Sequence, residues 1–227
     1  MKKILTVALF IVTTQSFAQT VGSVRFGLQF SPQLSWMGNS GNVTRSGSRF
    51  GLAYGLLTEF YIPKNYALAT GLGVSYEGGE LTYNDASTMF NSFANRSFSS
   101  GTSVVYRLEY IEIPVSIKLK TNQIGYVTYY GQFGLMGSIN IKSRADITSQ
   151  TGTITEIMNK VDFGKDVTPA NLALLIGGGI EYELSGNTAV NAGLQFTNGF
   201  IDITDNPKNF VSKNIMNHLR LQLGIFF

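Results

Sequence analysis

The stretch VRFGLQFSPQLSW, residues 24–36, carries the clearest structural signal in the chain. Its side chains alternate with a period of two. One phase is apolar and comprises Val24, Phe26, Leu28, Phe30, Leu34 and Trp36. The other is small or polar and comprises Arg25, Gly27, Gln29, Ser31, Gln33 and Ser35. This alternation is typical of a β-strand with one apolar face. Soluble strands usually run for about five or six residues, whereas a bilayer-crossing strand needs about 9–11, so residues 24–36 predict a membrane-spanning strand.

The same alternation recurs in seven further segments. They are residues 49–62, 66–77, 104–120, 126–141, 171–184, 189–200 and 215–227. The connections after the second, fourth and sixth predicted strands are short: 63–65, 121–125 and 185–187. The others are long: 38–48, 78–103, 142–170 and 201–213. Short turns on one side and long loops on the other are typical of outer-membrane barrels. The sequence therefore predicts an all-β fold, an eight-stranded antiparallel up-and-down transmembrane β-barrel with both termini periplasmic.

The composition agrees with a barrel in lipid. Charged residues make up 14% of the chain, against about 25% in an average soluble domain. The mean hydropathy of +0.09 is nevertheless too polar for a bundle of membrane helices. A barrel reconciles the two values, because one face of each strand contacts lipid and the other faces a polar interior. A soluble barrel would instead turn its apolar face inward.

The first residues resemble an export signal. Lys2 and Lys3 precede the apolar run ILTVALFIV, and Ser16 and Ala18 are the small residues that a signal peptidase requires. We expect a signal peptide over residues 1–18 and a barrel domain over 19–227. The alternative, an uncleaved anchor, is disfavoured because a spanning helix needs about 20 apolar residues.

Loss of the two lysines of the signal peptide lowers the formal net charge from +3 to +1, which argues against a nucleic-acid partner. The absence of cysteine excludes disulfides and thiolate chemistry.

Residues 104–120 contain two apolar sets in opposite phases. Tyr106, Leu108 and Tyr110 share one phase, and the other comprises Ile111, Ile113, Val115, Ile117 and Leu119. If both sets contact lipid, the register must shift near Tyr110, and a β-bulge produces such a shift. Pro114 lies just beyond this point, and a bulged region tolerates its missing ladder hydrogen bond better than a regular strand does.

The segment YIEIPVSIK, residues 110–118, resembles a recurring motif of the PorT-like outer-membrane β-barrel family of Bacteroidota. The C-terminal alternation that ends on Phe227 is similar to the signal by which the barrel-assembly machinery recognises its clients. The resemblance implies an outer-membrane barrel in contact with lipid and with that machinery. The namesake of the family is linked to type IX secretion, so the resemblance also implies an accessory role in a secretion or envelope complex.

The inward phase is rich in polar and charged side chains. It comprises Arg25, Gln29, Gln33, Glu59, Glu112, Lys118, Gln132, Glu181, Glu183, Asn191, Gln195, His218, Arg220 and Gln222. A proton path or narrow channel is one interpretation. The favoured one is a plug of paired charges, because eight strands enclose just enough space for side chains and unpaired buried charge is costly. We expect Arg25 to pair with Glu59, and Glu181 and Glu183 to reach Arg220 or Lys118.

Candidate catalytic, cofactor and metal residues are not found, and no cofactor is expected. His218 is the single histidine and lies towards the external side, but no G-x-S-x-G motif accompanies it. One histidine without cysteine excludes the usual His/Cys zinc site. The run 177–179, GGG, sits within a strand and lacks the Lys-Ser/Thr of a phosphate loop, so close packing explains it better.

Aromatic residues near the strand ends predict two interfacial girdles. They are Trp36, Tyr54, Tyr61, Tyr66, Tyr76, Tyr106, Tyr126 and Tyr129. The loops 78–103 and 142–170 carry further apolar residues, which form either a protein-partner surface or packing over the barrel mouth. The predicted function is that of a non-enzymatic structural or protein-interaction barrel. The alternatives are a small-solute transporter or ligand-binding barrel and, third, an external hydrolase.

Overall fold

A computed structural model describes residues 24–38, 41–62, 65–85, 88–93, 96–186, 188–205 and 212–227. The predicted signal peptide, residues 1–18, lies outside the described residues. Among the residues described, no helix has the length and apolar character needed to cross a membrane.

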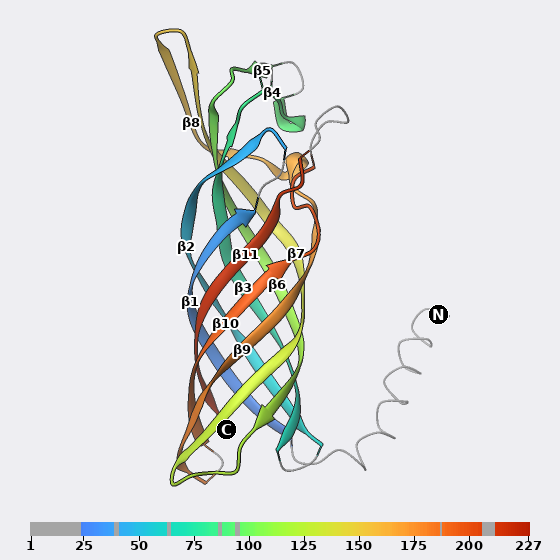
Figure 1. The fold of residues 1–227 in the computed structure, drawn as a ribbon, viewed down its shortest axis with the longest axis vertical. Coiled ribbons are helices and arrows are strands. Elements are labelled where there is room, and N and C mark those ends of the chain that lie inside the picture. The colour runs from blue at the N-terminus through green and yellow to red at the C-terminus, as the bar shows by residue number, and fades with distance from the viewer. Residues whose placement is uncertain are drawn as a thin grey trace, which may run out of the picture.

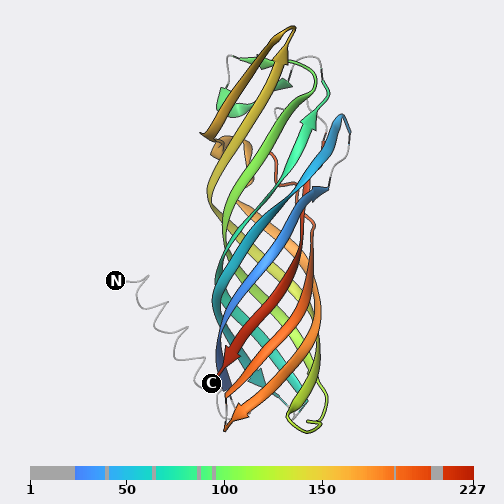
Figure 2. The same ribbon diagram turned by 90° about the vertical axis from the view of Figure 1, so that its left-hand side faces the viewer.

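Within the described residues, eight antiparallel strands close into a barrel (Figures 1 and 2). The strands are β1 (Val24–Gly38), β2 (Val43–Tyr61), β3 (Tyr66–Tyr83), β6 (Thr102–Lys120), β7 (Val127–Thr151), β9 (Ala170–Ser185), β10 (Thr188–Gly199) and β11 (Ile215–Phe226). Each pairs with the next along the chain, and the β1–β11 pairing closes the circle. Closure satisfies backbone groups that would cost several kcal/mol each if left unpaired in lipid. The predicted eight-stranded up-and-down barrel is confirmed.

The predicted facing is confirmed along the barrel wall, except in the upper half of β6, which is described below. The apolar side chains Leu28, Phe133 and Leu221 are exposed on the outer wall, with exposed fractions of 50%, 58% and 43%. Gln132 and Gln222 from the alternate phase are buried inside. This arrangement is the inverse of a soluble protein, as expected where the outer surface contacts lipid.

Glycines in the middle of the barrel make room for an aromatic ring. The predicted glycine run 177–179 lies within β9, and Gly179 pairs with Gly193 of β10. A Cβ added at Gly193 would clash with the hydroxyl oxygen of Tyr130, and one at Gly179 would lie 2.8 Å from it. The two glycines therefore admit the Tyr130 side chain to the interior.

One end of the barrel carries the short connections and the C-terminus, and the other carries the long loops (Figure 1). At the long-loop end β1, β2, β3, β6 and β7 continue beyond their predicted limits. The long loops also contain small elements: β4 (Thr88–Met89), η2 (Asn91–Phe93), β5 (Ser97–Phe98), β8 (Ile154–Asp162) and η3 (Gly164–Asp166). β8 pairs with the extended part of β7 as a hairpin that projects past the barrel.

The bulge predicted in residues 104–120 is not found there. β6 pairs with β3 continuously through Tyr110 and Ile111. Tyr106, Leu108 and Tyr110 point inward and are at most 1% exposed, so their assignment to the lipid face was wrong. The register shift lies in the partner strand, where Ile141 of β7 is the extra residue. β6 is an unbroken strand whose surroundings change along its length. In its lower part the apolar side chains face outward, towards lipid. In its upper part they face inward, into a core that the loops cover.

That upper core fills the mouth of the barrel and is called the cap core here. Its buried members include Met37, Val43, Leu81, Tyr83, Phe90, Phe98, Val104, Tyr106, Leu108, Tyr110, Ile147 and Phe163. Phe90 contacts Tyr83 and Phe163, each at a ring-centroid distance of 5.1 Å. The loop aromatics thus pack over the mouth, which confirms the packing interpretation for them. By contrast, Ile154 and Ile157 of the β7–β8 hairpin are 71% and 62% exposed.

The predicted aromatic girdles are confirmed in part. Tyr54, Tyr66, Tyr76, Tyr126 and Tyr129 are exposed on the outer wall. Trp36 stacks on Phe196 with ring centroids 6.2 Å apart. Two assignments were wrong, because Tyr61 hydrogen bonds into the interior and Tyr106 belongs to the cap core.

Candidate functional site

The interior of the barrel is filled by polar side chains, and the lowest tier lies near the short-turn end. Lys118 Nζ of β6 lies 2.6 Å from Glu59 Oε1 and 2.6 Å from Glu181 Oε1. Lys120 Nζ lies 2.6 Å from Glu59 Oε2 and 2.9 Å from Glu181 Oε1. All four side chains are at most 5% exposed. Two lysines on one strand therefore bridge two carboxylates from opposite walls.

Arg25 joins this tier through Glu181, at 3.1 Å between Nη1 and Oε2. Glu59 had been expected as its partner, and the two do lie opposite each other in the β1–β2 ladder. The ion pair that the structure gives Arg25 is nevertheless with Glu181, while Glu59 binds the two lysines. The predicted contact between Glu181 and Lys118 is confirmed. Lys120 was missed, although it shares the inward phase of Lys118.

A tier of amides occupies the middle of the barrel. Gln132 Nε2 donates to Gln195 Oε1 and to Gln222 Oε1, both at 3.2 Å. Beside these amides lies a cavity of about 20 Å³, which is room for about one water molecule. The period-two alternation of their strands predicts all three amides in the interior, and the structure confirms this.

The next tier is built on Arg220 of β11, whose side chain is 1% exposed. Its Nη2 donates to both carboxylate oxygens of Glu112, at 2.9 and 3.0 Å. Its Nε donates to Gln33 Oε1 at 2.9 Å, and Gln33 Nε2 in turn donates to Ser75 Oγ at 2.7 Å. A buried guanidinium held by a carboxylate and an amide is the arrangement that makes buried charge tolerable. Of the two predicted targets of Glu181 and Glu183, Arg220 is the one they do not reach: it is held by Glu112, and Glu183 instead accepts a hydrogen bond from Gln123.

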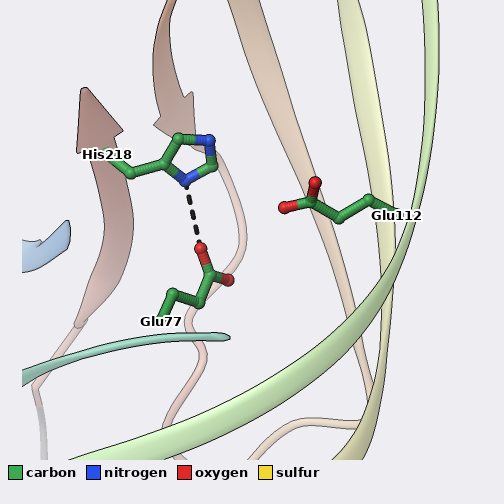
Figure 3. A group of neighbouring side chains, drawn as sticks. All are labelled: Glu77, Glu112 and His218. Carbon is green, nitrogen blue, oxygen red and sulfur yellow. Dashed lines mark hydrogen bonds and ion pairs between the residues drawn. The ribbon is translucent and has the colours of Figure 1, made fainter. Parts of the chain in front are cut away.

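Glu77, Glu112 and His218 form a buried group (Figure 3). Its member Glu112 is the carboxylate that binds Arg220. His218 Nδ1 and Glu77 Oε2 lie 3.1 Å apart, and one potential ligand atom from each residue lies within 4.8 Å of the others. Carboxylates and imidazole can hold a metal by donor type. Here, however, Glu112 is already bound by Arg220 and Glu77 by His218, so a divalent cation would have to displace an existing contact. Glu77 was missed because the predicted strand ended at it.

His218 lies inside the wall and is 3% exposed. Its Nε2 atom is buried, and among the described residues it has no hydrogen-bond partner. A nucleophile, base and acid must be hydrogen bonded in sequence for a catalytic triad. Within the described part of the chain, His218 is joined to Glu77 but to no Ser or Thr hydroxyl.

Above these tiers the cap core is held in place by Asp166 of η3. The backbone N–H groups of Asn91 and Ser92 donate to its two carboxylate oxygens at 2.5 and 2.9 Å. Partial burial raises the pKa of the Asp166 carboxyl above its usual value, although these hydrogen bonds act in the opposite direction. The contact ties the loop after β3 to the loop after β8, so the two longest loops close over the mouth together.

A second, larger cavity opens at the short-turn end. Its volume is about 360 Å³, and its lining includes Arg25, Tyr61, Lys120, Glu181 and Glu183. It ends where the lowest charged tier begins, since Lys120 and Glu181 belong to both. The arrangement is therefore a cup at one mouth, polar tiers along the barrel and an apolar cap at the other mouth.

Residues 17–205 match a family model described as outer membrane protein beta-barrel domain. No curated protein is similar enough to match. Among solved structures, Neisserial surface protein A is 12% identical and has a TM-score of 0.48, over 91% of this chain and 97% of that chain. A major outer membrane protein from Thermus thermophilus is 12% identical with a TM-score of 0.46, over 91% and 99%. Ail, the attachment invasion locus protein of Yersinia pestis, is 12% identical with a TM-score of 0.40, over 91% and 100%.

Proposed function

Because the chain belongs to the outer membrane protein beta-barrel domain family, we propose that it is a non-conducting, non-enzymatic barrel with a structural or protein-interaction role. The observation that carries this proposal is the filled interior. Three polar tiers span the barrel, and the cap core closes the mouth above them. Paired charges and interlocked amides fill the lumen, so we expect no steady path for ions through the barrel.

The placement of the loops supports one orientation of the barrel in the membrane. We propose that residues 1–18 are a signal peptide and that both termini of the mature chain are periplasmic. The short connections then face the periplasm and the long loops face outside, which is the usual arrangement of such barrels. The lipid of the outer membrane and the barrel-assembly machinery are the partners that this location requires.

Within the family, we propose a PorT-like protein of Bacteroidota. The support is the segment YIEIPVSIK, residues 110–118. Two of its charged residues, Glu112 and Lys118, each hold one tier of the interior. The motif is thus compatible with a structural role in the barrel wall, and accessory service in a secretion or envelope complex is the finer form of the proposal.

Closure is tested by the absence of conductance. We expect purified protein in planar bilayers to show no steady channel current, because the charged tiers and the cap core occupy the lumen. Stepwise porin-like currents in the wild-type protein would contradict the proposal. The positive control is a conducting porin reconstituted and recorded in the same way.

The partner surface is expected at the β7–β8 hairpin, which belongs to the loop 142–170. Ile154 and Ile157 are exposed there, and exposed apolar residues on a projecting element are typical of interaction sites. We expect proteins that co-purify from native outer membranes to be lost from the variant Ile154→Ser/Ile157→Ser. The matched control is Met89→Ser in the loop 78–103, an exposed apolar residue outside the hairpin. Unchanged co-purification in the hairpin variant would remove this surface from consideration.

The alternative function, a small-solute transporter or ligand-binding barrel, rests on the cup of about 360 Å³ at the short-turn end. Its lining carries both signs of charge, which suits a zwitterionic solute. Saturable binding that is abolished by Glu183→Gln, together with measurable flux, favours this alternative over the closed barrel.

A further inference from the structure

The barrel wall contains a notch at the base of the β7–β8 hairpin. β7 pairs with β9 up to Ile139, and with β8 from Arg144 onwards. Between these positions the edge of β7 is bordered by the loop that joins β8 to β9. Asn140 donates its N–H to the Pro169 carbonyl at 2.8 Å, and Phe163 donates to the Ser143 carbonyl at 3.1 Å. The change of partner leaves a cavity of about 460 Å³.

Three cations line this cavity. They are Lys142, Arg144 and Lys160, and Asp162 also contributes to the lining. The site is called the basic notch below. Its lining carries an excess of positive charge, because three cations face one carboxylate. Such an excess on a membrane protein selects for an anionic ligand.

The notch lies at the border of the apolar belt. Ile139 and Ile141 are 54% and 50% exposed on the outer wall, and Lys142 follows them directly. On the neighbouring strand β6, the outward positions opposite Arg144 and Lys142 are occupied by Arg107 and Glu109, where the lower part of the strand has apolar residues. Cations directly above the last lipid-facing residues stand at the height of the lipid head groups.

Two of the three cations of the notch have no ion-pair partner within the described residues. Lys142 Nζ has Glu109 Oε1 at 3.1 Å, and Asp162 Oδ1 accepts a hydrogen bond from the Gly164 N–H. Arg144 and Lys160 form no ion pair within the described residues. Arg144 also lies directly opposite Arg107 in the β6–β7 ladder, and like charges opposite each other destabilise a sheet. Arg107 forms an ion pair with Asp146. Arg144 has Asp162 opposite it in the β7–β8 ladder but forms no ion pair within the described residues.

The backbone at Lys160 is held in an unfavourable conformation. Its φ is 52°, in the left-handed region that residues other than glycine rarely adopt. The register of β7 and β8 shifts here, between Ala145 and Ile147. The Lys160 N–H donates to Asp146 Oδ1 at 2.7 Å and fixes the bulge. Strain of this kind concentrates at sites that bind a ligand.

We propose that the basic notch binds the phosphate group of lipid A, the anionic glycolipid of the outer leaflet. Arg144 and Lys160 hold the phosphate oxygens, since guanidinium and ammonium groups form charge-assisted hydrogen bonds to phosphate. Lys142 adds positive charge, and the acyl chains lie against Ile139 and Ile141. The assignment rests on the proposed orientation, because lipid A occupies the leaflet that the long loops face.

The test is lipid binding by the purified full-length barrel in detergent, measured by native mass spectrometry during titration with lipid A. We expect the wild type to retain lipid A, and Arg144→Gln/Lys160→Gln to bind it about 25-fold more weakly. That loss corresponds to about fivefold per cation removed near an anionic surface. Arg144→Lys should retain most of the binding. Arg45→Gln is the matched control, since Arg45 is an exposed cation at the same end of the barrel, and it should bind as the wild type does.

Two further ligands separate the sources of the phosphate. Dephosphorylated lipid A carries the same acyl chains and should bind far more weakly than lipid A. Inorganic phosphate at millimolar concentration should not displace the lipid. The proposal is overturned if the double variant binds lipid A as tightly as Arg45→Gln, if the dephosphorylated lipid binds equally well, or if inorganic phosphate alone displaces the lipid. Conductance measured on the same preparation reports separately on the closed barrel, so the two proposals can fail independently.

Discussion

Replacement of Glu112 by leucine is expected to destabilise the folded barrel by about 3–5 kcal/mol, because Arg220 would be left buried without its counter-ion. The Arg220 side chain is 1% exposed and binds both oxygens of Glu112. The measurement is urea-induced unfolding in lipid vesicles, followed by tryptophan fluorescence and by heat-modifiable migration on a gel.

A double variant separates charge pairing from packing. Glu112→Leu/Arg220→Met removes both charges and keeps the volume, so most of the lost stability should return. Glu109→Leu is the matched control on the same strand. Its partner Lys142 is partly exposed, and surface ion pairs contribute at most about 1 kcal/mol. If Glu112→Leu were no more damaging than Glu109→Leu, the Arg220 tier would not be a buried ion pair.

Arginine in place of Leu221 is expected to cost about 2–4 kcal/mol, because it places a charge near the middle of the lipid-facing wall. Leu221 lies between Leu219 and Leu223 on the outer face of β11 and is 43% exposed there. The readout is again the free energy of unfolding in vesicles, with folding yield as a second measure.

The matched control for this substitution is Tyr126→Arg. Tyr126 is also on the outer wall, at the short-turn end, and is 66% exposed. The cost of arginine there should fall to about 0–1 kcal/mol, as it does near an interface. Equal costs at the two positions would contradict the assignment of Leu221 to the bilayer interior.

The barrel could be predicted from the sequence because its signal is local. Period-two alternation in β1 and β11 identifies the lipid face without knowledge of any partner strand. The same phase identified Glu59, Lys118 and Arg220 as interior residues. The pairings among them could not be predicted, since inward residues meet according to strand tilt and stagger. That geometry brings Arg25 to Glu181 and Arg220 to Glu112.

Residues near the strand ends were harder to predict. Lys120 and Glu77 have the inward phase, but each lies at the limit of a predicted strand and was left out of the interior set. The facing of the upper half of β6 could not be predicted for a different reason. Tyr106 and Tyr110 point inward because the loops cover them there. The sequence of β6 alone does not show that loops from elsewhere in the chain will cover this part of the strand.

The inversion of polarity along β6 has a thermodynamic consequence. Lipid-facing side chains such as Ile117 remain in an apolar medium whether the chain is folded or only inserted, so water release contributes little to their packing. Tyr106 and Phe90 leave water when the cap core closes, and burial from water carries a large heat-capacity change. Two parts of one continuous sheet therefore respond differently to temperature. Cooling weakens the driving force for the cap core and leaves the membrane-embedded wall largely unaffected.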